Sequence, residues 1–181
     1  MKYNVVLIVG PAGSGKDFFT KSLCNFYETK IKRVVTATTR PKRNYEQHGR
    51  DYYFMTIGEF SNSKMLESTN FNGWWYGTPL KSLSSTKTNI AIVNPSGIEA
   101  YLNCKDINVQ AIIYLCVEDK IRLIRQLERE EEPNCGEIMR RYNADTQDFK
   151  NINEKYPLII LPNNSMEDMM TNIKLFQDIL N

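Results

Sequence analysis

Histidine and cysteine are scarce in this sequence of 181 residues. There is a single histidine, His48, and the four cysteines lie far apart without a C-x-x-C spacing: Cys24, Cys104, Cys116 and Cys135. A structural zinc site takes four nitrogen or sulfur ligands, usually in closely spaced pairs, so the sequence offers no zinc site. The thiols are expected to be reduced, as they are in an intracellular protein.

The net charge is also small, and the hydrophobic runs are short. A formal charge of +2 provides no basic field that would predict a nucleic-acid partner. No apolar run approaches the roughly 20 residues that cross a membrane, and Val5–Val9 lacks the length and cleavage site of a signal peptide. We therefore expect a cytoplasmic protein without nucleic-acid or membrane partners. It could be a monomer or a homodimer.

What is present is an alternation of strand and helix patterns. Hydrophobic residues at 41% and charged residues at 24% are typical of a single globular domain of this length. Apolar, β-branched runs recur at 5–9, 34–38, 90–93, 109–117 and 157–161. Helical patterns lie between them, at about 16–27, at 118–130 and after a capping box at Ser165 and Asp168. The pattern predicts an α/β fold with a parallel sheet flanked by helices.

Two segments interrupt the alternation. Residues 39–80 read as turns, short strands and one short helix, Ile57–Lys64, and they are rich in Tyr, Trp and Arg. Residues 129–139 are charged and contain Pro133 and Gly136. Both are expected at the end of the sheet where α/β proteins bind ligands.

A glycine-rich loop follows the first strand. Its glycines allow a tight backbone that points N–H groups at phosphate oxygens, and Lys16 adds a positive charge at the start of a helix. This strand–loop–helix context predicts a nucleoside triphosphate site, and the residues expected to form it are Gly10, Pro11, Ala12, Gly13, Ser14, Gly15, Lys16, Asp17 and Phe18.

Asp17 stands where such loops have Ser or Thr, whose hydroxyl holds Mg²⁺. A carboxylate beside a triphosphate repels it unless a cation lies between them. Since Mg²⁺ binds carboxylate oxygen, directly or through water, we expect Asp17 to contact Mg²⁺. The alternative is an acid that only stabilises the N-terminus of the helix.

A second cluster suited to phosphate lies in the first insert. Arg40, Arg43 and Arg50 occur among tyrosines, and guanidinium groups and phenols are good donors for a terminal phosphate. Glu67 follows, and a carboxylate can accept two N–H donors from a base edge.

These motifs, taken in order, resemble the guanylate kinase family along nearly the whole chain. The matching residues are Thr38-Thr39-Arg40-Pro41, Arg43, Glu46, Gly49-Arg50-Asp51-Tyr52-Tyr53-Phe54, Glu67 and Tyr76-Gly77-Thr78. The resemblance implies a P-loop NTPase-type sheet and the reaction of ATP with GMP or dGMP to give ADP and GDP or dGDP, with Mg²⁺. It divides the chain into a core (1–35, 80–127 and 140–181), a GMP-binding insert (about 36–79) and a lid (about 128–139).

The resemblance also implies roles for individual residues. The GMP phosphate would be held by Arg40, Arg43, Tyr52 and Tyr76. The guanine edge would be bound by Glu67, and the base would also contact Thr36 and Thr78. The GMP site would further include Glu46 and Asn94. Lys16 and Arg40 would act in phosphoryl transfer together with lid-region arginines, for which the candidates are Arg125, Arg129, Arg140 and Arg141. Asn163 falls where the family places a residue near adenine.

The chain departs from the family at one strand. An Asp-x-Asp pair is usual there, serving Mg²⁺ and the guanine amino group, and this chain has Ile92 and Asn94. Asp17 is then a candidate to replace the missing charge near the metal. The Gly-Lys-Asp and Val-Asn-x-Ser sequences also resemble ribose 1,5-bisphosphate phosphokinase, whose relatives lack the arginine–tyrosine cluster. Two further candidates are a deoxynucleoside monophosphate kinase with relaxed base choice and a non-catalytic guanylate-kinase-like binding module.

Overall fold

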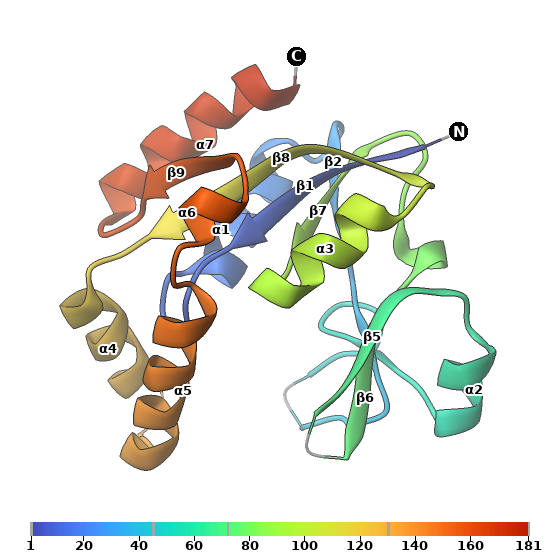
Figure 1. The fold of residues 1–181 in the computed structure, drawn as a ribbon, viewed down its shortest axis with the longest axis horizontal. Coiled ribbons are helices and arrows are strands. Elements are labelled where there is room, and N and C mark those ends of the chain that lie inside the picture. The colour runs from blue at the N-terminus through green and yellow to red at the C-terminus, as the bar shows by residue number, and fades with distance from the viewer. Residues whose placement is uncertain (1, 45, 72, 130, 181) are drawn as a thin grey trace.

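A computed structural model describes residues 2–44, 46–71, 73–129 and 131–180. Its core is a parallel sheet in the order β2-β7-β1-β8-β9 (Figure 1). The strands are β2 (Ile31–Arg33), β7 (Thr88–Ile92), β1 (Tyr3–Val9), β8 (Ile107–Cys116) and β9 (Leu158–Pro162). β1 lies at the centre and is apolar on both faces, because helices cover both sides of the sheet.

Two hydrophobic clusters lie on the two faces of β1. Val6 and Ile8 pack with side chains of α1 (Lys16–Phe26) and α7 (Met166–Leu180). Val5, Leu7 and Val9 pack with side chains of α3 (Pro95–Asn103) and of the short helix α6 (Ile152–Lys155). The parallel sheet between helical layers, together with the inserted sheet described next, confirms the predicted fold class.

The insert forms its own mixed sheet in the order β4-β3-β6-β5. It contains β3 (Ala37–Thr38), β4 (Tyr53–Phe54), α2 (Ile57–Asn62), β5 (Met65–Phe71) and β6 (Trp74–Pro79), and the 3-10 turn η1 (Leu80–Ser82) leads back to the core. The prediction of one core strand at 34–38 was wrong. Val34 still donates its N–H to Ile90 O, but the chain then leaves the core, and only Ala37 and Thr38 form a strand, in the second sheet.

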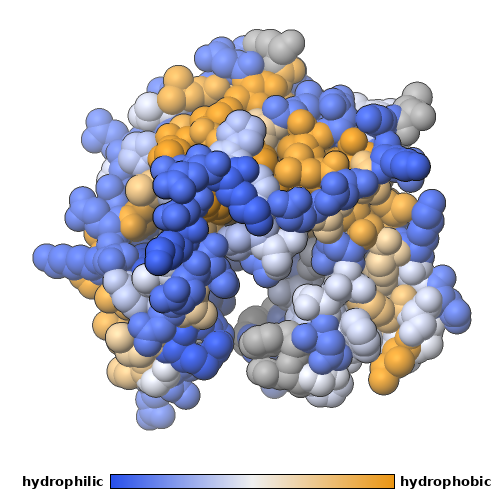
Figure 2. All heavy atoms as spheres, in the orientation of Figure 1, coloured by the Kyte–Doolittle hydropathy of each residue, from blue (hydrophilic) through white to orange (hydrophobic). Residues whose placement is uncertain are grey.

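Helices α4 (Asp119–Leu127) and α5 (Cys135–Asp148) lie side by side and extend away from the core (Figure 1). The predicted lid limit at residue 139 falls inside α5, and Glu130 of that segment lies outside the described residues. Figure 2 shows an open cleft between this helical pair and the insert, beneath the core sheet. No helix within the described ranges is long and apolar enough to cross a membrane.

Candidate functional site

The glycine-rich loop joins β1 to α1 at the carboxyl end of the sheet. Gly13 has φ +79°, and a Cβ there would lie 2.3 Å from the carbonyl oxygen of Arg122 in α4. Gly15 has φ +85° and a Cβ would lie 2.8 Å from Nδ2 of Asn163. Both positions have the left-handed backbone that favours glycine, and at Gly13 the backbone of α4 also leaves no room for a Cβ. The loop is therefore packed tightly between α4 and the segment that follows β9.

Lys16 folds over this loop. Its Nζ donates hydrogen bonds to Gly10 O at 2.6 Å and to Pro11 O at 2.9 Å. Burial lowers the pKa of Lys16, and the nearby carboxylate of Asp145 opposes that shift. The ammonium group thus lies at the loop that it is predicted to serve.

Asp145 and Arg122 lie at the loop, and neither residue was among those predicted for the site. The N–H of Ala12 donates to Asp145 Oδ2 at 2.7 Å. Arg122, only 4% exposed, contacts Asp145 at 3.4 Å and Asp119 at 2.8 Å, and its guanidinium lies 4.3 Å from the ring centre of Tyr142. No signal in the sequence points to either residue, because the contact between Asp145 and Ala12 joins residues 133 positions apart.

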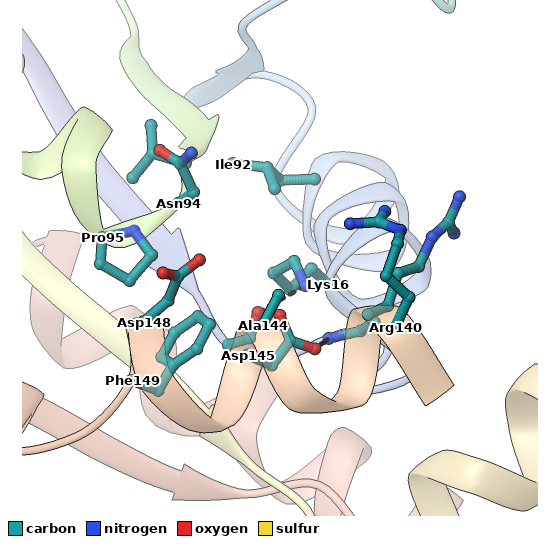
Figure 3. Close-up of a pocket in the computed structure, with 13 residues that line it drawn as sticks. Lys16, Ile92, Asn94, Pro95, Arg140, Ala144, Asp145, Asp148 and Phe149 are labelled. Carbon is teal, nitrogen blue, oxygen red and sulfur yellow. Dashed lines mark hydrogen bonds between the residues drawn. The ribbon is translucent and has the colours of Figure 1, made fainter. Parts of the chain in front are cut away.

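A cavity of about 350 Å³ opens beside the loop (Figure 3). Loop residues line one side, the end of β7 another and α5 a third, with Lys16, Asn94, Asp145 and Asp148 contributing polar groups. Asn94 caps α3: its Oδ1 accepts from Gly97 N at 2.9 Å and from Ser96 Oγ at 3.0 Å. The cavity brings together three segments that are far apart in the sequence.

Asp17 lies at the start of α1, and its carboxylate points to solvent. Oδ1 accepts from Arg33 Nη2 at 3.0 Å, and the Asp17 side chain is 73% exposed. Among the described residues, no three His, Cys, Asp or Glu side chains gather into a metal cage. The residues able to meet a cation near the loop are therefore single carboxylates, and Mg²⁺ commonly uses one or two of these together with substrate phosphates.

The arginine cluster of the insert is held by Glu46, which is 7% exposed. Its carboxylate accepts from Arg40 Nη2 at 2.6 Å and from the backbone N–H of Arg43 at 2.8 Å. This contact raises the pKa of Arg40 and lowers the pKa of Glu46. Glu46 thus positions the two arginines. The guanidinium of Arg40 also lies 5.7 Å from the ring centre of Tyr52.

Tyr52 and Tyr76 lie together, with ring centres 6.2 Å apart. Burial raises the pKa of Tyr52, so its hydroxyl stays a donor. Arg50 pairs instead with Asp51 on the outside of the insert. The structure therefore brings Arg40, Tyr52 and Tyr76 together.

Glu67 is connected to the core through two hydroxyls. Thr78 Oγ1 donates to Glu67 Oε1 at 2.8 Å, and Tyr101 Oη of α3 donates to Thr78 Oγ1 at 3.3 Å. Thr78 and Tyr101 are each 1% exposed, and burial raises the pKa of Glu67 above its ordinary value. Thr36 lies in the link between the two sheets, where its carbonyl accepts from Tyr53 N.

The arginines predicted for the lid region occupy different places. Arg125 turns toward backbone carbonyls, at 3.0 Å from both Asn163 O and Asn164 O, and so ties α4 to the loop after β9. Arg140 and Arg141 line the cavity and both bind Glu137, whereas Arg129 is exposed at the end of α4.

Two residues predicted for the ATP site also lie apart from the cavity. Asn163 is 4% exposed, and its Nδ2 donates to Ser14 O at 2.8 Å, so it supports the glycine-rich loop from behind. Phe18 is 55% exposed on α1.

Comparison with known proteins shows which family the sequence matches. The family model described as guanylate kinase matches residues 2–178. A guanylate kinase of Polaromonas sp. is 27% identical over 168 residues, which cover 84% of this chain and 81% of that protein. A guanylate kinase of Onion yellows phytoplasma is 29% identical over 164 residues, which cover 87% of this chain and 77% of that protein. A guanylate kinase of Clostridium acetobutylicum is 40% identical over 83 residues, which cover 44% of this chain and 39% of that protein.

The fold has a counterpart of known structure. The crystal structure of guanylate kinase from Anaplasma phagocytophilum superposes with a TM-score of 0.59 at 20% identity, over 99% of this chain and 86% of that one. At this identity the likeness concerns the fold alone. The match of the family model over 2–178 decides the assignment, as the sequence motifs predicted: the chain belongs to the guanylate kinase family.

Proposed function

We propose that this protein transfers the γ-phosphoryl group of ATP to GMP or dGMP and releases ADP and GDP or dGDP. The predicted enzyme class, a nucleoside monophosphate kinase, is confirmed by the family. The observation that supports a phosphate-bearing acceptor is the arginine–tyrosine cluster of the insert, where Glu46 holds Arg40 at 2.6 Å beside the paired rings of Tyr52 and Tyr76.

Phosphoryl transfer needs positioning and charge neutralisation more than covalent chemistry. Lys16 and the loop N–H groups would bind the donor phosphates, and Arg40 and Arg43 the acceptor phosphate. The acceptor oxygen is already anionic at neutral pH, so no general base is needed. Arg140 and Arg141 would exchange Glu137 for the moving phosphoryl group when the α4–α5 pair closes over the cleft, which would also exclude water.

Base recognition is proposed for Glu67. With Thr78 holding one of its oxygens, the carboxylate is oriented to accept N–H donors from a purine edge. Thr36 and Asn94 would contribute more weakly: the oxygen of Asn94 is already used to cap α3, and the amide brings no charge.

Magnesium would arrive with the ATP phosphates and supply charge neutralisation when bound. We propose that Asp17 contacts it, directly or through water, in exchange for the Arg33 pair, which is exposed and therefore weak. A cytoplasmic location is proposed on the four free cysteines, Cys24, Cys104, Cys116 and Cys135, which fit a reducing compartment.

A second candidate is a deoxynucleoside monophosphate kinase of relaxed base choice, which the uncharged, cap-forming Asn94 favours. A ribose 1,5-bisphosphate kinase has no need of the Arg40–Glu46 cluster or of Glu67. A non-catalytic binding module has no need of the lysine that lies over the loop.

An ADP-release assay with ATP and Mg²⁺ tests the proposal against GMP, dGMP, AMP, dTMP, dCMP and ribose 1,5-bisphosphate. We expect turnover with GMP or dGMP to exceed that of the other acceptors. Glu67→Gln should remove the preference, whereas Glu59→Gln, which removes a charge from the same insert at the start of α2, should keep it. Equal turnover of all monophosphates supports the relaxed kinase, and turnover of ribose 1,5-bisphosphate alone contradicts the proposal.

A further inference from the structure

Asp145 lies at the donor-phosphate loop, although no motif of the sequence gives it a role. Its Oδ2 atom accepts a hydrogen bond of 2.7 Å from the backbone N–H of Ala12. The N–H groups of such a loop are donors for phosphate oxygens. A carboxylate oxygen therefore stands where an oxygen of a nucleotide phosphate would accept the same proton.

We propose that Asp145 is an affinity-determining residue of the donor site, whose carboxylate holds the N–H of Ala12 and has to leave before the donor phosphates bind. The proposal rests on the donor half of the proposed function, not on the choice of acceptor.

The Ala12 N–H can bind either the carboxylate of Asp145 or a donor phosphate, but not both at once. A carboxylate and a phosphate are both anions, and one N–H cannot serve both at full strength. The cavity beside the loop is where Asp145 and Lys16 approach each other (Figure 3). Asp145 thus supplies negative charge near Lys16, a function that the phosphates would take over on binding.

The position of Asp145 is fixed by neighbours. Arg122 contacts Asp145 at 3.4 Å and Asp119 at 2.8 Å, and it stacks on Tyr142 of α5. When Asp145 leaves, Arg122 still has Asp119, so the displacement does not strand a buried charge. Because Asp145 belongs to α5, its release removes the hydrogen bond between that helix and the N–H of Ala12.

Asp148 provides a matched control. It lines the same cavity from the same helix, three residues on, but within the described part of the chain it has no hydrogen bond to the loop. Figure 3 shows it near Pro95 and Phe149. Asp148→Asn removes one negative charge from the cavity and leaves the Ala12 contact in place.

Calorimetric titration of the whole protein with inorganic pyrophosphate, in EDTA, tests the proposal. Asp145→Ala should bind pyrophosphate about tenfold more tightly than the wild type, since a competing hydrogen bond to a charged group is removed. Asp145→Asn should bind more tightly as well, and Asp148→Asn should change binding less than about threefold, through long-range charge alone. Binding by Asp145→Ala that is no tighter than by Asp148→Asn, or that is weaker than by the wild type, overturns the proposal.

Amide hydrogen exchange at Ala12 gives a readout that does not depend on affinity. Exchange should be slow in the empty wild type, faster in Asp145→Ala and slow again in both when pyrophosphate is added. Equal exchange in the empty wild type and the empty variant contradicts the contact. If GMP is phosphorylated but neither readout moves, this inference fails alone; if pyrophosphate behaves as expected and no monophosphate is phosphorylated, the proposed function fails instead.

Discussion

Removing the carboxylate of Glu46 tests whether its contacts with Arg40 and Arg43 stabilise the insert. The Arg40–Glu46 pair is largely buried, with side-chain exposures of 14% and 8%, and the same carboxylate accepts from Arg43 N. In Glu46→Gln the amide cannot form the ion pair, and Arg40 keeps its charge without its main partner.

The cost follows from these two contacts. Loss of one partner of a mostly buried, hydrogen-bonded ion pair costs about 3 kcal/mol. For a domain of this size 1 kcal/mol lowers Tm by about 2–4 °C, so Glu46→Gln should lower Tm by about 6–12 °C. GMP should restore part of this loss, because its phosphate would give Arg40 a new anionic partner.

Thermal unfolding with and without GMP is the assay, and Asp51→Asn is the control. Its partner Arg50 is 54% exposed, and loss of such a pair should cost less than about 1 kcal/mol. The pKa of Glu46 is lowered in the folded protein, so its contribution is present above the ordinary pKa of a glutamate and is lost as pH falls through the lowered value. A Tm for Glu46→Gln equal to that for Asp51→Asn at neutral pH would mean that Glu46 does not hold the insert together.

Glu67, Tyr101 and Asp17 can each be tested by one substitution. Glu67→Gln should raise KM for GMP at least about tenfold, which steady-state kinetics would measure. It should not lower the free energy of unfolding at neutral pH, because burial raises the pKa of Glu67 and its ionised form destabilises the fold. Urea unfolding checks this second expectation. In the wild type, KM for GMP should rise as pH falls through that raised pKa, and a flat acidic profile would separate Glu67 from base recognition. Tyr101→Phe should raise KM for GMP about fivefold and leave KM for ATP and kcat unchanged, since the lost hydroxyl orients Thr78 and not the loop. Asp17→Ser should keep activity but shift the Mg²⁺ concentration that the activity requires. An unchanged Mg²⁺ dependence would mean that Asp17 does not contact the metal and only pairs with Arg33.

Local motifs and apolar periodicity were enough to predict the core and the glycine-rich loop. Val5–Val9, followed by GPAGSGK, specifies a buried strand, a tight turn and a helix from neighbouring residues alone. The run at 34–38 was wrongly predicted as a core strand, because β-branched residues also suit an extended link between two sheets. Which sheet each residue joins depends on its hydrogen-bond partners: Val34 bonds to Ile90 in the core, and Ala37 pairs with Gly77 in the insert.

Long-range contacts at the site were beyond the sequence. The contact of Asp145 with Ala12 joins residues 133 positions apart and depends on how α5 folds back over the loop. Arg125 could not be distinguished from the other arginines, because its role is set by the carbonyls of residues 163 and 164. Glu46 was predicted for the same site as Arg40 and Arg43, but its contact with both arginines became visible only in three dimensions.

A crystal structure with ADP, Mg²⁺ and GMP bound would show whether two phosphate sites are filled from opposite sides of one cleft, as the proposed function requires. We expect the ADP phosphates on the loop at Lys16, with Asp145 displaced, and the GMP phosphate on Arg40, Arg43, Tyr52 and Tyr76. GMP bound elsewhere, with the guanidinium of Arg40 turned away from any phosphate, would contradict the proposed function.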